Sequence, residues 1–246
     1  MPEQTVKLLL TKMNELSSEK YKENVVKLGI PAENSLGVST SDLRKMIASI
    51  PKAERTSQLT EALWQTGFHE AKILAVLVGS YCYNDFSEQA IHSMMTEIYS
   101  WDLCDLFCKS ILIKRKDFDK WIEIFLNSES LYTKRAGFTL LAAMSTHASL
   151  SEEQVSYYLS LIPKFSNDER LHLKKAASWA LRELGKIDES AKEKSISLAN
   201  DLLNAQSKAH QWIAKDALKE LNTLIRVEGR SRLISANTKM GKAALK

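Results

Sequence analysis

The chain is poor in the residues that interrupt helices. Its 246 residues include only 8 Gly and 4 Pro, and both residue types disfavour the interior of a helix. Leu, Ala, Lys, Glu and Ser are abundant instead, and most of these residues form helices readily. The composition therefore predicts an all-α chain, with an ordinary hydrophobic share of 44% to build a core.

Cysteine and long apolar runs are also scarce. The 3 cysteines, Cys82, Cys104 and Cys108, form no framework of pairs, which indicates a reducing compartment. Cys104 and Cys108 would share one helical face without a nearby histidine pair, so we interpret them as core residues and predict no metal site. No apolar run is long enough to span a bilayer, and we find no basic-then-apolar signal peptide pattern. We therefore expect a cytoplasmic protein without a membrane partner.

Positive charge is modest in total but clustered. The formal net charge is +4, which alone demands no nucleic acid. One basic cluster lies between Lys109 and Lys120, and a second lies between Arg226 and Lys246, where Glu228 is the one acidic residue. Such clusters favour polyanions, although a solvated helix face is the alternative interpretation of each.

Apolar spacing predicts helices along most of the chain. Pro163 is expected to break the chain, Gly185 to cap a helix C-terminus, and His69 and Glu70 to pin or cap a helix rather than bind metal. We expect one helical domain over residues 1–226 and a loosely ordered basic tail over 227–246. The expected helices cover residues 5–28 (as one or two), 40–50, 53–64, 69–81, 87–99, 101 onward, 118–126, 132–144, 151–162, 168–184, 191–205 and 209–226.

A repeat is visible in the second half of the chain. The blocks KRAGFTLL (134–141), KKAASWAL (174–181) and AKDALKEL (214–221) recur at intervals of 40 residues. This period in a helical chain is typical of a HEAT/ARM-like α-α superhelix, a solenoid of antiparallel helical hairpins. The repeated basic residues would line one groove, unless they are ordinary surface charges. They are Arg135, Lys175 and Lys215, with Lys134 and Lys174 beside them.

The segment SWDLCDLF (100–107) carries the most chemistry. Trp101 and Asp105 are four residues apart, so a helix places them on one face. An aromatic plate can pack on a sugar, and a carboxylate can stabilise a developing positive charge. A core Trp with a solvated Asp is the alternative, and Asp102 would be the acid if the helix phase differs.

Four blocks together resemble a known family. HEAKILA (69–75), SWDLCDLFC (100–108), TKRAGFTLLA (133–142) and KKAASWALRELGK (174–186) are similar to the recurring blocks of the AlkD-type DNA alkylation repair glycosylase superfamily, and GVSTSDLRKM (37–46) is similar to its early helix start. The resemblance covers residues 37–221. It implies a HEAT-like fold and excision of cationic N-alkylated purines, such as 3-methyladenine and 7-methylguanine, from double-stranded DNA.

The resemblance also implies roles for single residues. Trp101 and Trp179 match the aromatic wall beside the deoxyribose of the lesion, Asp105 matches the acidic residue at the glycosidic bond, and Arg135 matches the phosphate-binding arginine. It implies no cofactor and no deep base pocket, and we expect a monomer. Two alternatives stay open, a non-catalytic helical-repeat module that binds nucleic acid and a protein-binding scaffold.

Overall fold

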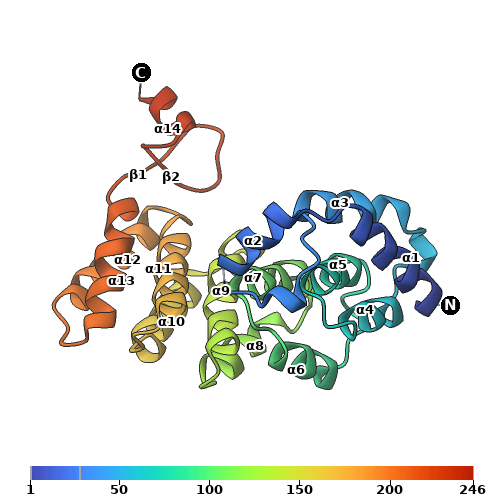
Figure 1. Cartoon of the computed structure of the whole chain (residues 1–246). Coiled ribbons are helices and arrows are strands. Elements are labelled where there is room, and N and C mark those ends of the chain that lie inside the picture. Colours follow the sequence, from blue (N-terminus) through green and yellow to red (C-terminus); the bar gives the residue numbers. More distant parts are fainter. Residues whose placement is uncertain (1, 28, 246) are drawn as a thin grey trace. The chain divides into compact units, whose positions relative to one another are not determined.

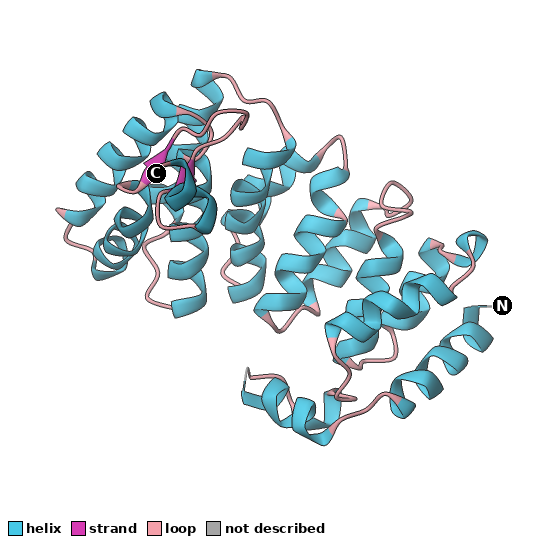
Figure 2. Cartoon of the chain, turned by 90° about the horizontal axis from the view of Figure 1, so that it is seen from above, coloured by secondary structure: helices cyan, strands magenta, loops and turns pink. Residues whose placement is uncertain are grey.

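The fold is described by a computed structural model that covers residues 2–27 and 29–245. Helices make up most of these residues, and two short strands pair near the C-terminus (Figure 2). The chain divides into two compact units, residues 1–116 and 117–246. The all-α fold expected from the composition is confirmed, whereas the single domain over residues 1–226 stays a prediction.

Unit 1 is built around α5, in which every residue is buried. This helix packs against α3, α4 and α7, which explains why its sequence is apolar on all sides rather than on one stripe. The helices of unit 1 (Figure 1) are α1 Pro2–Glu15, α2 Glu19–Lys27, α3 Thr40–Ser49, α4 Ser57–Trp64, α5 His69–Gly79, α6 Glu88–Thr96 and α7 Trp101–Ser110, with short 3-10 turns at Ala32–Asn34, Lys52–Glu54 and Leu112–Lys114.

Side-chain caps set several of these boundaries. Ser39 accepts a hydrogen bond from the Asp42 amide at 3.1 Å and caps α3. The expected helix over 53–64 starts too early, because Thr56 caps α4 by accepting from the Leu59 amide. The preceding residues Lys52–Glu54 form a separate 3-10 turn.

Unit 2 consists of stacked helical hairpins. The helices α9, α11 and α13 pack in sequence against one another, each beside its own partner helix. The repeated Leu141, Leu181 and Leu221 are all completely buried, which confirms the repeat. The helices (Figure 1) are α8 Phe118–Leu126, α9 Leu131–His147, α10 Glu152–Phe165, α11 Leu171–Gly185, α12 Glu189–Leu203, α13 Lys208–Leu221 and α14 Lys239–Ala244.

Two boundary predictions in unit 2 were wrong. Pro163 does not break the chain, because it lies inside the last turn of α10. Gly185 is no C-cap but the last residue of α11. A Cβ atom on Gly185 would lie 2.6 Å from Cδ2 of Leu221, so this glycine allows α11 and α13 to approach closely.

The C-terminal segment was expected to be loose, yet residues 227–245 are ordered. Helix α13 ends at Leu221, and the strands β1 Leu224–Ile225 and β2 Ile234–Ser235 pair antiparallel. Leu233 is buried, and its amide donates to the Lys186 carbonyl at 2.8 Å. These long-range contacts order a segment in which the sequence alone shows few large apolar residues. Lys246 lies outside the described residues.

Candidate functional site

Helix α7 presents Trp101 and Asp105 on its partly exposed face. Both side chains are half-buried, and they lie one helical turn apart. The opposite face is completely buried and holds Leu103, Cys104, Phe107 and Cys108, which confirms that Cys104 and Cys108 are core residues. Ser100 occupies the N-cap position without a side-chain capping bond.

Asp102 is engaged by a buried histidine. Its Oδ2 atom lies 3.0 Å from Nε2 of His69, a side chain that is only 3% exposed. Burial opposes ionisation of Asp102, but hydrogen bonding and the charge of His69 outweigh it and lower the pKa of this carboxyl. The pair joins the first residue of α5 to the first turn of α7, so His69 pins a helix as predicted.

Polar groups that the sequence analysis missed surround this pair. Lys72 is buried, with its Nζ 3.0 Å from Oε2 of Glu97 and 4.8 Å from the ring centroid of Trp64. The Trp64 indole donates to the same Glu97 oxygen at 2.9 Å. The available signal was a lysine inside an otherwise apolar helix, because such a lysine needs an anionic or aromatic partner.

Two atoms of this polar cluster lack a partner among the described residues. They are Nδ1 of His69 and the Tyr99 hydroxyl. Burial raises the pKa of Tyr99 to about 12, helped by the charges of Glu70 and Asp102, so the phenol stays protonated at neutral pH. The contact between His69 and Asp102 connects this cluster to the first turn of α7, the helix that carries Trp101.

Glu70 fixes the loop before α3. Its carboxylate accepts from the Ser35 hydroxyl at 2.7 Å and from the Leu36 and Gly37 amides at 2.8 and 2.9 Å. Gly37 has φ +75°, a conformation that other residues rarely adopt. The buried carboxylate thus ties α5 to the loop in which the family-like segment GVSTSDLRKM begins.

In unit 2, Arg135 lies at the start of the second turn of α9. The side chain is buried, and its Nη1 donates to the His172 carbonyl of α11 at 2.7 Å. The guanidinium therefore helps to join two successive repeats. The phosphate-binding role of Arg135 stays a prediction.

The remaining predicted residues of unit 2 differ in exposure. Trp179 is half-buried on α11, and Lys134 is half-buried on α9, whereas Lys175 and Lys215 are exposed at equivalent positions of their repeats. Lys174 is mostly covered and lies 3.0 Å from Oε2 of Glu169. Lys175 and Lys215 are thus the most accessible cations of the predicted groove.

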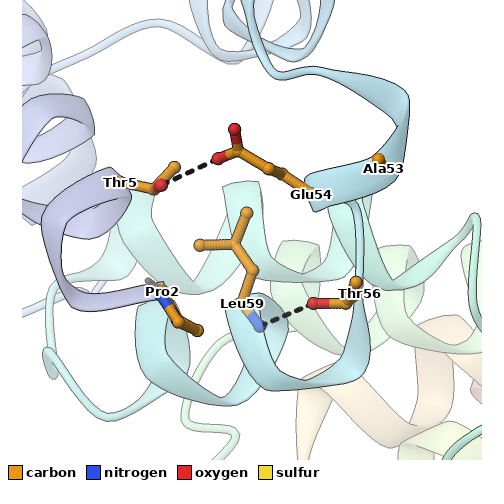
Figure 3. Close-up of a pocket in the computed structure, with 6 residues that line it drawn as sticks. All are labelled: Pro2, Thr5, Ala53, Glu54, Thr56 and Leu59. Atoms are coloured by element: carbon orange, nitrogen blue, oxygen red, sulfur yellow. Dashed lines mark hydrogen bonds between the residues drawn. The ribbon is translucent and has the colours of Figure 1, made fainter.

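A cavity of about 280 Å³ lies in unit 1 between α1 and α4 (Figure 3). The Thr5 hydroxyl donates to Oε2 of Glu54 at 2.8 Å along one side of it. None of the predicted site residues lines this cavity, which is bounded by Pro2, Thr5, Ala53, Glu54, Thr56 and Leu59.

The comparisons with known proteins agree with the fold. A solved structure described as "a new family of proteins related to the HEAT-like repeat DNA glycosylases with affinity for branched DNA structures" has a TM-score of 0.69 and 16% identity, and the alignment covers 97% of this chain and 92% of that one. This similarity confirms the HEAT-like repeat fold.

A search of curated protein sequences found no match. A family model described as "DNA alkylation repair enzyme" matches residues 9–221. Because that match covers most of the sequence, the chain belongs to the DNA alkylation repair enzyme family.

Proposed function

We propose that the protein is a DNA N-glycosylase that removes cationic N-alkylated purines from duplex DNA. Membership of the DNA alkylation repair enzyme family supports a role in repair. The observation that carries the catalytic part is the face of α7, where an indole and a carboxylate lie one turn apart and both remain partly exposed.

The chemistry needs few protein groups. An alkylated purine is already positively charged, so cleavage of the C1′–N bond gives its electron pair to the base and releases a neutral purine. Positive charge then develops on the sugar, where the Asp105 carboxylate and the Trp101 ring can stabilise it. A water adds hydroxide to C1′ and loses one proton, which completes the hydrolysis.

The contact of Asp102 with His69 disfavours Asp102 as the catalytic carboxylate. Asp102 holds His69 at 3.0 Å, so any movement toward DNA would leave a buried histidine without this partner, at a cost of roughly 1–3 kcal/mol. Asp105 follows Trp101 by one turn on the same face, where both groups could meet one deoxyribose.

Unit 2 would supply DNA-holding groups. Lys175 and Lys215 are exposed on successive repeats and can contact phosphates, while Lys134, Lys174 and Arg135 lie on or beside the same row. Trp179 is half-buried on α11 and is proposed as the second aromatic plate beside the sugar.

Release of free methylated base from alkylated duplex DNA tests this proposal. We expect Asp105→Asn to lower single-turnover release by at least about 100-fold, the usual loss when one stabilising group is removed. Binding of undamaged duplex should be unchanged or tighter, because the variant removes a negative charge. Absence of release by the wild-type protein, or full release by the variant, would contradict the catalytic role.

A second candidate function is binding of DNA without excision. It is favoured by the described affinity of the structurally similar protein for branched DNA. In this case a three-way junction should bind more tightly than a linear duplex of equal length, and no base should be released. Lys175→Ala should weaken binding in both cases, whereas only the glycosylase proposal predicts loss of base release in Asp105→Asn.

A further inference from the structure

The segment after α13, residues 222–245, is held against the helices of unit 2 by partly buried contacts. Nη2 of Arg232 donates to the Glu183 carbonyl at 2.7 Å, to a Glu183 carboxylate oxygen at 3.1 Å and to the Ser145 hydroxyl at 3.0 Å. Lys192 also donates to the Leu224 carbonyl at 2.9 Å. Figure 1 shows the segment beyond the ends of α11, α12 and α13. The segment is therefore held against these helices and is not a free tail.

This segment is strongly basic. Arg226, Arg230, Lys239 and Lys242 are exposed, and within the described residues none of them forms an ion pair. Arg226 donates to the Ser231 carbonyl at 3.2 Å, a contact inside the segment itself. Glu228 is the one acid between residues 226 and 246. Four like charges within one short segment repel one another, and a polyanion would relieve that repulsion.

The C-terminal segment contacts one end of α11, and the predicted DNA-contacting lysines lie at the other end. Lys174 and Lys175 are near the start of this helix. Glu183 and Lys186, whose carbonyls accept hydrogen bonds from the segment, are at its end. With a rise of 1.5 Å per residue, the eleven steps from Lys175 to Lys186 span roughly 16 Å. This is close to half of the 34–36 Å repeat of B-DNA.

We propose that the basic platform, defined as Arg226, Arg230, Lys239 and Lys242, is a second DNA-contact surface. It binds phosphates of the same duplex about half a helical turn from the phosphates held by Lys175. This inference rests on the proposed DNA-binding role of the α11 lysines. It assigns no part in the chemistry to the platform, which acts by sequence-independent charge contacts.

The salt dependence of binding to undamaged duplex tests the surface. The triple variant Arg226→Gln, Arg230→Gln and Lys242→Gln should bind with a shallower slope of log K against log salt. Each lost phosphate contact lowers the slope by about 0.9, so three contacts lower it by about 2.7. Fluorescence anisotropy over a salt series measures this change.

Two further variants separate charge from structure. Lys7, Lys12 and Lys20 are exposed cations of unit 1, and changing all three to Gln removes the same charge elsewhere. That control should keep the wild-type slope. The charge-preserving variant Arg226→Lys, Arg230→Lys should also keep it, provided that thermal unfolding shows both platform variants to be folded. An unchanged slope in the triple-Gln variant, or an equal loss in the unit 1 control, overturns the proposal.

Duplex length gives an independent test. The wild-type protein should gain affinity between a hairpin-closed duplex of about 4 base pairs, roughly 14 Å long, and one of about 16, because only the longer one spans the distance between both surfaces. The triple-Gln variant should lose this gain, and equal gain in both proteins would contradict the inference. Base release is measured separately, so a protein that excises nothing can still confirm or refute the platform.

Discussion

At the scale of single residues, His69 and Asp102 determine how α7 is held. The pKa of Asp102 is lowered in the folded protein, so the carboxylate contributes stability above the unfolded-state value of 3.8. This contribution is lost as the pH falls through the lower, folded-state pKa. We expect Asp102→Asn to reduce the free energy of unfolding by about 1.5–3 kcal/mol at neutral pH, the usual value for a hydrogen bond to a charged group.

Urea unfolding measured at several pH values checks this prediction. The difference between wild type and Asp102→Asn should shrink as the pH falls below about 4 and should be largest well above it. Asp201 is an exposed aspartate of α12, and Asp201→Asn should leave stability within about 0.5 kcal/mol of wild type. A difference for Asp102→Asn that grows on acidification would contradict the assigned pKa direction.

At the scale of elements, Glu70 links α5 to the loop before α3. Removing its carboxylate in Glu70→Ala leaves the Ser35 hydroxyl and the Leu36 and Gly37 amides without their buried acceptor. Each unsatisfied buried group costs about 1–3 kcal/mol, so the free energy of unfolding should fall by at least about 3 kcal/mol. Hydrogen exchange should accelerate at Leu36 and Gly37.

The matched control is Glu33→Ala, because Glu33 is an exposed acid in the 3-10 turn before the same loop. It should leave the exchange of these amides unchanged. Equal protection of Leu36 and Gly37 in the wild type and in Glu70→Ala would show that the loop does not depend on this carboxylate.

The element boundaries show what the sequence can predict and what it cannot. Helical spacing of apolar residues predicts α8 as Phe118–Leu126, the bounds that the structure has, and the 40-residue period predicts the stacked hairpins. The predictions for Pro163 and Gly185 were wrong because the effect of such a residue on a helix boundary depends on its position in the helix and on its packing. Pro163 forgoes one backbone hydrogen bond, but only the last residues of α10 follow it, and the space beside Gly185 is set by Leu221 from another helix.

The candidate site shows the same division. The spacing of Trp101 and Asp105 follows from helix geometry and could be predicted, and the structure places both on one face of α7. The partners of Lys72 could not be predicted, because Glu97 and Trp64 come from different helices. Likewise, helical spacing favours Asp105 over Asp102, but it could not predict that Asp102 contacts the distant His69.

At the scale of the whole molecule, charge should govern binding to undamaged DNA. The net charge of +4 includes exposed cations on successive repeats of unit 2, among them Lys175 and Lys215. If about four cations contact phosphate, log K should fall against log salt with a slope of about −3.6. Anisotropy titrations of a fluorescent duplex between about 50 and 200 mM salt measure this slope. An affinity that does not change with salt concentration would contradict an interface made of phosphate contacts.

Hydrogen bonds between successive repeats join residues that are separated by the same number of positions in the sequence. The Ser178 hydroxyl donates to Asp216, Arg182 donates to Glu220, and Lys194 donates to the Ser156 hydroxyl, each across 38 positions. Deleting one residue within α12 would rotate everything after it by about 100° about the helix axis and separate both Asp216 and Glu220 from their partners at once. Evolutionary insertions and deletions in this half of the protein should therefore be confined to the connections between helices, such as residues 166–170 and 204–207.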